Sequence, residues 1–136
     1  MATEPEKILL VDDNPLYLEG LKLSLNLLFK NVDLKCINNG ESLTKNLIEK
    51  YNPDIIISDI SMKGIGGLKA LENIRNDNIK TPILMLSMHD RKEYLEQSIK
   101  LKANGFLLKD TDLNKLKQVI ELLLSGENYF SENNFQ

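Results

Sequence analysis

The sequence predicts an α/β fold in which a doubly wound, five-stranded parallel sheet carries helices on both faces. The first observation behind this prediction is a set of five short apolar runs, at residues 8–11, 32–37, 55–57, 83–86 and 106–108. The second is that a helix-length segment follows each run, and strands that alternate with helices form parallel sheets. Because crossovers between parallel strands are right-handed, the connecting helices should cover both faces.

The five runs differ in how apolar they are. Four are nearly continuous in apolar residues, as strands that helices cover on both faces must be. The second run alternates, with Asp33 and Lys35 between Val32, Leu34 and Cys36. Alternation with a period of two is typical of a strand with one wetter face, so we expect this strand at an edge of the sheet.

The helices are predicted from the signals at their ends. A first helix over about residues 15–29 would begin with a proline, which suits the first helical turn. A second helix over residues 41–50 should end ahead of Pro53, because the residue before a proline avoids the helical region. Three more are expected over residues 68–75, 90–101 and 112–124. Asp90 and Asp112 are the N-caps that we expect for the last two.

Length and composition indicate an ordinary globular domain. The chain has 136 residues, of which 42% are apolar and 27% are charged, and a chain of this size builds a core without disulfides or metals. Its net charge of −3 argues against direct binding of nucleic acid by this segment, since contacts to phosphates need clustered Lys and Arg.

The cysteine content, the length of the apolar runs and the start of the chain predict the cellular compartment. Cys36 is the single cysteine, so an internal disulfide is excluded and a reducing cytoplasm fits. No apolar run approaches the roughly 20 residues that span a bilayer. The polar, acidic start of the chain differs from a secretory signal. We therefore expect a cytoplasmic protein without a membrane segment.

Polar residues that could take part in a reaction follow four of the predicted strands. Asp12 and Asp13 follow the first, Asp59 the third, Ser87 the fourth and Lys109 the fifth. In parallel α/β sheets, ligands bind at the carboxyl ends of the strands, so these side chains converge if the four strands are neighbours. Three carboxylates at one place repel each other, which makes a purely structural role for the cluster costly.

This set of groups suits phosphoryl transfer. A hard cation such as Mg²⁺, or Mn²⁺ in its place, would bind the acids, while Asp59 attacks phosphorus and Lys109 and Ser87 bind the phosphoryl oxygens. Taken singly, each residue also fits an ordinary role, such as an acid at a helix start, a turn hydroxyl or a solvated lysine. Their shared position directly after apolar strands favours the common chemistry.

Four motifs resemble those of response-regulator receiver domains, the CheY-like superfamily. They are VDDNP at 11–15, ISDISM at 57–62, MLSMH at 85–89 and GFLLKD at 105–110, and the resemblance covers residues 6–126. It implies a flavodoxin-like sheet of order 2-1-3-4-5. It also implies that a partner histidine kinase phosphorylates Asp59.

The resemblance further implies roles for individual residues. Asp13, Asp59 and the main-chain carbonyl of Ser61 would bind Mg²⁺ directly, and Asp12 would act mostly through metal-bound water. Ser87 and Phe106 would form the conformational switch.

Three positions near the site carry further expectations. Ser61 and His89 occupy positions that influence the lifetime of the phosphoryl group in the family. Lys63 stands where most of the family has proline, which predicts a looser loop with an extra cation.

Two segments resemble one subfamily in particular. GFLLKD and the segment LSGENYFS at 124–131 are similar to receivers of regulators with a LuxR-type helix-turn-helix output, the NarL-like group. We accordingly expect residues 1–5 to be an N-terminal tail, 6–126 the receiver, and 127–136 a C-terminal tail or the start of a linker to an output domain that this chain lacks. The alternative is a stand-alone phosphorelay receiver with no DNA-binding output.

Two other classes of function fit the sequence less well. A phosphatase that forms an aspartyl phosphate usually has a second acid two residues after the nucleophile, where this chain has Ser61. A flavin-binding relative of flavodoxin would have Ser, Thr and Gly after the first strand, whereas Asp12 and Asp13 would repel a phosphate without a metal.

The first predicted helix has more leucines than one buried stripe uses. Leu18, Leu21, Leu25 and Leu28 fall on one side at about 100° per residue. The leucines that fall nearly opposite are Leu16, Leu23 and Leu27. Either the last helix covers this second stripe, or the two helices form a homodimer interface.

Overall fold

The computed structural model describes residues 4–130 and confirms the predicted parallel α/β architecture. The sheet has the order β2-β1-β3-β4-β5-β6, and all five neighbouring pairs of strands are parallel. The expected order 2-1-3-4-5 is therefore present. The main strands are β1 (Lys7–Val11), β2 (Asp33–Ile37), β3 (Ile55–Asp59), β4 (Ile83–Ser87) and β5 (Gly105–Leu108).

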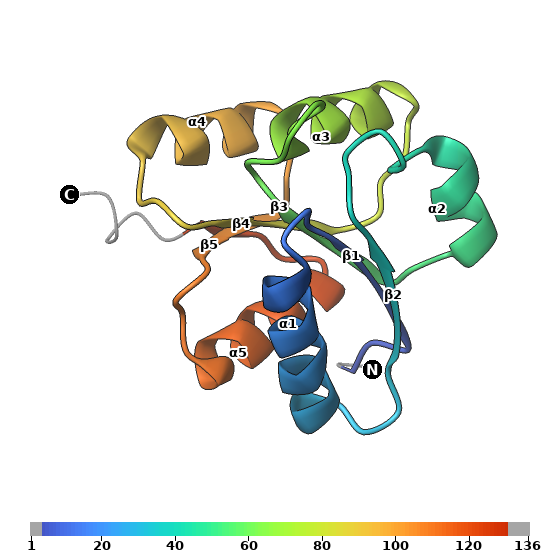
Figure 1. The fold of residues 1–136 in the computed structure, drawn as a ribbon, viewed down its shortest axis with the longest axis vertical. Coiled ribbons are helices and arrows are strands. Elements are labelled where there is room, and N and C mark those ends of the chain that lie inside the picture. The colour runs from blue at the N-terminus through green and yellow to red at the C-terminus, as the bar shows by residue number, and fades with distance from the viewer. Residues whose placement is uncertain (1–3, 131–136) are drawn as a thin grey trace.

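Helices cover both faces of the sheet, as Figure 1 shows. On one face lie α1 (Pro15–Leu28) and α5 (Leu113–Leu124). On the other lie α2 (Lys45–Tyr51), α3 (Gly67–Asn76) and α4 (Lys92–Lys100). None of the helices within residues 4–130 is both long enough and apolar enough to cross a bilayer.

Capping side chains set where three helices begin. Asn14 caps α1, and Asp112 caps α5 by accepting a hydrogen bond from the Lys115 N–H, as predicted for Asp112. The predicted start of α2 at residue 41 is wrong, because Thr44 is the residue whose hydroxyl accepts from the first turn.

The prediction of Asp90 as an N-cap is also wrong. Helix α4 begins at Lys92, and Arg91 occupies its N-cap position. The physical reason lies just upstream, where the main chain of His89 is hydrogen-bonded to the Ser87 hydroxyl in a turn. The helix can begin only after that turn.

A short sixth strand, β6 (Tyr129–Phe130), extends the sheet beyond the five strands predicted. It pairs with β5, and the Tyr129 N–H donates to the Asn104 carbonyl at 2.9 Å. Gly126, with φ +93°, turns the chain after α5. Part of the predicted tail is thus a strand, and residues 131–136 lie outside the described residues.

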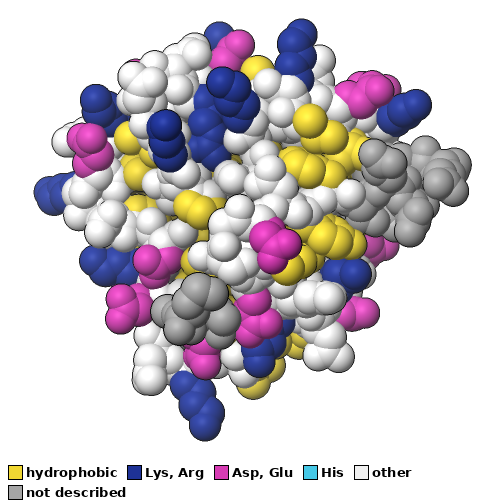
Figure 2. Space-filling view, turned by 180° about the vertical axis from the view of Figure 1, so that it is seen from behind, with side chains coloured by type: hydrophobic (Ala, Val, Ile, Leu, Met, Phe, Trp, Pro, Cys, Tyr) yellow, Lys and Arg dark blue, Asp and Glu magenta, His cyan; other side chains and the backbone are white. Residues whose placement is uncertain are grey.

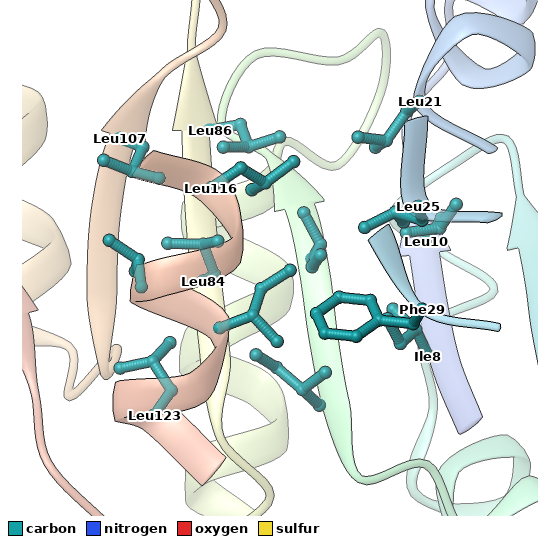
Figure 3. Close-up of a cluster of buried hydrophobic side chains, with 14 of the residues drawn as sticks. Ile8, Leu10, Leu21, Leu25, Phe29, Leu84, Leu86, Leu107, Leu116 and Leu123 are labelled. Atoms are coloured by element: carbon teal, nitrogen blue, oxygen red, sulfur yellow. The ribbon is translucent and has the colours of Figure 1, made fainter. Parts of the chain in front are cut away.

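Each face of the sheet has its own apolar core. The core between the sheet and α1 and α5 includes Leu10, Leu25, Phe29, Leu84 and Leu123, which face one another in Figure 3. The alternate residues of the same strands point to the opposite face of the sheet, where they pack with α2, α3 and α4. Edge strand β2 alternates between exposed and half-buried residues, as its sequence predicts.

The surplus leucines of α1 are exposed. Leu18, Leu21 and Leu25 are buried against the sheet. The opposite stripe is open to solvent, with Leu16 83%, Leu23 68% and Leu27 79% exposed. Helix α5 therefore does not cover them. On the face of the molecule opposite to the view of Figure 1, exposed apolar side chains are interspersed with charged ones, as Figure 2 shows.

Candidate functional site

The carboxyl edge of the sheet brings together the polar residues that were predicted to converge. Strands β1, β3, β4 and β5 are consecutive neighbours, so the residues at their ends share one edge. Asp12 is 2%, Asp59 6% and Ser87 1% exposed. Asp59 and Ser87 are the last residues of their strands rather than the first of a loop. Burial of this many polar groups at one place is typical of a functional site.

One ammonium group links two buried acids. The Lys109 Nζ donates to Asp12 Oδ2 at 2.7 Å and lies 3.3 Å from Asp59 Oδ1. The other oxygen of Asp12 accepts from the Asn14 N–H at 2.8 Å. The backbone of Lys109 is fixed too, since its N–H donates to the Ser87 carbonyl at 2.7 Å. The fold therefore determines where this cation lies.

The surroundings of Asp59 make its charged form costly. Burial raises the pKa of the Asp59 carboxyl above its ordinary value, and the charge of Asp12 raises it further. Lys109 and the Ser61 N–H, which is 3.4 Å from Asp59 Oδ1, act in the opposite direction. A cation placed beside the ionised Asp59 carboxylate would therefore stabilise it, and so would a bond from one of its oxygens to an electrophile.

The three acids are placed as the ligands of one cation. Asp12, Asp13 and Asp59 each offer a carboxylate oxygen, and these oxygens lie within 4.8 Å of one another. Hard divalent cations such as Mg²⁺ prefer such ligands. Asp13 is held by the loop after β3, because the Lys63 N–H donates to its Oδ2 at 2.9 Å. The donor set of this acidic triad fits such an ion.

The Ser87 hydroxyl is hydrogen-bonded to the main chain of His89. It donates to the His89 carbonyl at 2.8 Å and accepts from the His89 N–H at 3.0 Å. The His89 side chain is exposed and lines a hollow of about 350 Å³ together with Asp59 and Lys109. Phe106 is only 1% exposed and belongs to the core on the α3 and α4 face. The Phe106 side chain is therefore part of the packed interior on that face.

Two residues at the site were not predicted from the sequence. A Cβ at Gly67 would clash with the Asp59 carbonyl oxygen, so glycine allows α3 to begin directly against the end of β3. The Lys109 Nζ lies over the ring of Tyr17, 4.2 Å from its centroid. Burial, with the charges of Asp12 and Asp59, raises the Tyr17 pKa to about 12. The repeated glycines at 64, 66 and 67 were a visible signal, whereas Tyr17 reads as an ordinary helix residue.

Comparison with known proteins finds one family. The family model for the response regulator receiver domain matches residues 8–121. The transcriptional regulatory protein MctR of Rhizobium johnstonii is 32% identical over 136 residues, which cover 99% of this chain and 63% of MctR. The nitrate/nitrite response regulator NarL of Escherichia coli is 31% identical, over 95% of this chain and 59% of NarL.

A solved structure agrees with these matches. The signal receiver domain of a response regulator NarL from Mycobacterium tuberculosis superimposes with a TM-score of 0.79 at 28% identity. The match covers 91% of this chain and 99% of that one. The curated relatives are longer, since this chain spans less than two thirds of MctR and NarL.

Proposed function

This chain belongs to the response regulator receiver family, and we propose that it accepts a phosphoryl group on Asp59 from the phosphohistidine of a sensor histidine kinase. The observation that carries the proposal is the buried Asp59 carboxylate, which shares the Lys109 ammonium with Asp12 and lies within reach of Asp13. Phosphoryl transfer is catalysed mainly by positioning and by neutralisation of charge, and these residues supply both.

The proposed step exchanges one bond to phosphorus for another. A bond forms between an Asp59 carboxylate oxygen and phosphorus as the P–N bond of the donor phosphoimidazole breaks. The bonding pair leaves with the imidazole nitrogen, and a proton from solvent restores the neutral imidazole. The Lys109 ammonium, already 3.3 Å from Asp59 Oδ1, is placed to bind a phosphoryl oxygen as negative charge spreads over it.

We also propose that the domain works with Mg²⁺, or with Mn²⁺ in its place. Asp13, Asp59 and the Ser61 carbonyl would hold the cation, with Asp12 bonded to its water. A cation bound there would add positive charge next to the transferring phosphoryl group. The same site takes part in hydrolytic loss of the phosphoryl group. We propose that Ser61 and His89, which line the hollow, influence how long the phosphoryl group survives.

The proposed signal passes through Ser87 and Phe106. A phosphoryl oxygen on Asp59 would offer the Ser87 hydroxyl a charged acceptor in place of the His89 carbonyl. Phe106, which is paired with Met85 one strand away, would then repack. Movement of this packed pair is the kind of two-state change that a local charge can bias.

The output that we propose is control of transcription in the cytoplasm. MctR is a transcriptional regulatory protein and NarL a nitrate/nitrite response regulator, and both are longer than this chain. Residues 6–126 would be the receiver, and the segment after them would lead to a LuxR-type DNA-binding domain. If the natural gene encodes no such domain, a stand-alone phosphorelay receiver is the alternative.

Self-association through α1 and α5 completes the proposal. The exposed leucine stripe formed by Leu16, Leu23 and Leu27 is apolar surface that a second copy would bury. We expect light scattering over a concentration series to show dimers that Leu23→Glu disrupts. A monomer at high concentration, with and without the phosphoryl mimic beryllofluoride, would contradict this part of the proposal.

The test of the phosphoryl chemistry is incubation with acetyl phosphate and Mg²⁺, followed by intact mass measurement. We expect a gain of one phosphoryl group that Asp59→Asn abolishes. Asp54→Asn is the matched control, because Asp54 directly precedes β3, at the opposite end of that strand from Asp59, and its carboxylate accepts from the backbone N–H groups of residues 6 and 7. An Asp59→Asn protein that still takes up the phosphoryl group would refute the assignment.

A further inference from the structure

Lys109 lies at the boundary between two hollows. On one side is the hollow that contains Asp13, Asp59 and His89. On the other is a groove of about 460 Å³ between α1 and α5, lined mostly by apolar residues. Tyr17 lines this groove and its ring lies under the Lys109 ammonium, 4.2 Å from the centroid. The ammonium is thus held between two carboxylates and an aromatic ring.

We infer that Tyr17 is a positioning residue for phosphoryl transfer, whose ring face holds the Lys109 ammonium in the site through a cation–π contact. The inference rests on the proposed function and deepens it. The Lys109 side chain is 8% exposed, so its charge is largely removed from water. Cation–π contacts are stronger in such surroundings than at an exposed site.

The need for this contact follows from the shared carboxylates. Asp12 and Asp59 hold Lys109, yet the same two residues belong to the acidic triad that suits a divalent cation. A cation that draws on those oxygens weakens their hold on the ammonium and also repels it, because like charges close together raise the energy. The Tyr17 ring attracts the ammonium and offers no oxygen in this contact, so it does not compete for the metal.

The backbone of Tyr17 is fixed to the loop that carries the acids. The Asn14 side chain accepts hydrogen bonds from the N–H groups of Leu16 and Tyr17, at 3.1 Å and 3.2 Å. The Asn14 N–H in turn donates to Asp12 Oδ1. The ring and the carboxylate that share Lys109 are therefore held by one short, capped segment. This rigidity is what a positioning residue needs.

The experiment replaces Tyr17 by phenylalanine and by phenylalanines with increasing numbers of ring fluorines. Fluorine withdraws electron density from the ring face while changing its size little, so the cation–π attraction declines stepwise. With acetyl phosphate and Mg²⁺ we expect Tyr17→Phe to be phosphorylated at nearly the rate of the natural protein. The rate should fall with each added fluorine and be about 10-fold lower in Tyr17→Leu.

A matched control uses the same substitutions at Tyr51. Lys7 and Lys35 lie over the Tyr51 ring at 5.5 Å and 5.9 Å, at the opposite end of the strands from Asp59. Fluorination there should leave the phosphorylation rate unchanged. Unfolding midpoints measured for all variants separate loss of folding from loss of positioning.

The outcomes distinguish this inference from the function on which it rests. If the natural protein takes up no phosphoryl group, the proposed function fails. If it does so but the rate is independent of fluorine number, Tyr17 only packs in the groove and the inference is wrong. Equal rates for Tyr17→Leu and Tyr17→Phe would overturn it in the same way.

Discussion

Two parts of the carboxyl edge differ in how they are held. The acid cluster, formed by Asp12, Asp13, Asp59 and Lys109, is joined by charged contacts that link residues distant in sequence. The Ser87 turn, residues 87–89, is held by two hydrogen bonds within three residues. The fold thus fixes the groups that we propose for the chemistry, whereas a small local arrangement holds the hydroxyl that we propose for signalling.

The energies of the two parts explain this difference. A neutral hydrogen bond contributes about 1 kcal/mol net, while one to a charged group contributes about 1.5–3 kcal/mol. A phosphoryl oxygen on Asp59 would therefore compete well with the His89 carbonyl for the Ser87 hydroxyl. The acid cluster, in contrast, should keep its arrangement, because Lys109 links Asp12 to Asp59 and the Lys63 N–H holds Asp13.

Among substitutions that test the difference between the acid cluster and the Ser87 turn, we expect the largest effect at Asp13, on Mg²⁺ affinity. Asp13→Asn removes one of few charged ligands, so we predict that Mg²⁺ affinity falls by about 100-fold, as measured by titration calorimetry. Asp77→Asn changes the net charge equally at the exposed end of α3 and should bind Mg²⁺ like the natural protein. Equal affinities for the Asp13 and Asp77 variants would show that the acid cluster is not the metal site.

A second prediction concerns stability without metal. The pKa of Asp59 is raised in the folded state, chiefly by burial. The folded protein therefore binds this proton more tightly than the unfolded chain, and stability falls as pH rises from the ordinary value of 3.8 through the raised pKa. At neutral pH without divalent cations, Asp59→Asn should raise the urea midpoint and leave the slope unchanged.

Two controls sharpen that measurement. The gain in the urea midpoint should shrink in acid, where Asp59 itself is protonated. Saturating Mg²⁺ should stabilise the natural protein more than the variant, because a ligand that binds the folded state stabilises it by RT ln(1 + [L]/Kd), which is larger for the tighter binder. A variant less stable than the natural protein at neutral pH without metal would contradict the electrostatic account of the site.

The smallest predicted effect is at His89, on the rim of the hollow. Its side chain is exposed, and we expect it to affect how water reaches the phosphoryl group rather than to carry phosphate. His89→Ala should change the dephosphorylation rate by about 3-fold, as for the loss of one weak hydrogen bond. Identical decay of the phosphorylated protein and the variant, followed by intact mass, would assign His89 to the solvated surface.

The site could be predicted from the sequence because of the topology. In a parallel sheet, the ends of neighbouring strands share an edge, so residues such as Asp12 and Lys109 are brought together although they are far apart in the chain. The apolar runs identified the strands, and the acids and lysine directly after them identified the site.

Other features depend on contacts that only the folded chain makes. The start of α4 is set by the hydrogen bonds between Ser87 and His89, and these override Asp90 as a cap. Strand β6 has only two residues, too few for a periodic pattern, and forms because Phe130 packs against the core that contains Phe106. Tyr17 has a helical spacing like any other residue of α1, and only its position under Lys109 distinguishes it.

The central claim is that phosphorylation changes the Ser87 turn and leaves the acid cluster in place. A crystal structure with Mg²⁺ and beryllofluoride on Asp59 tests it most directly, since the mimic presents a tetrahedral, negatively charged group to Ser87. We predict that the Ser87 hydroxyl leaves the His89 carbonyl for a fluorine of the mimic, while Asp12, Asp13 and the Tyr17 ring stay where they are. A bound mimic with Ser87 still hydrogen-bonded to His89 would contradict the account.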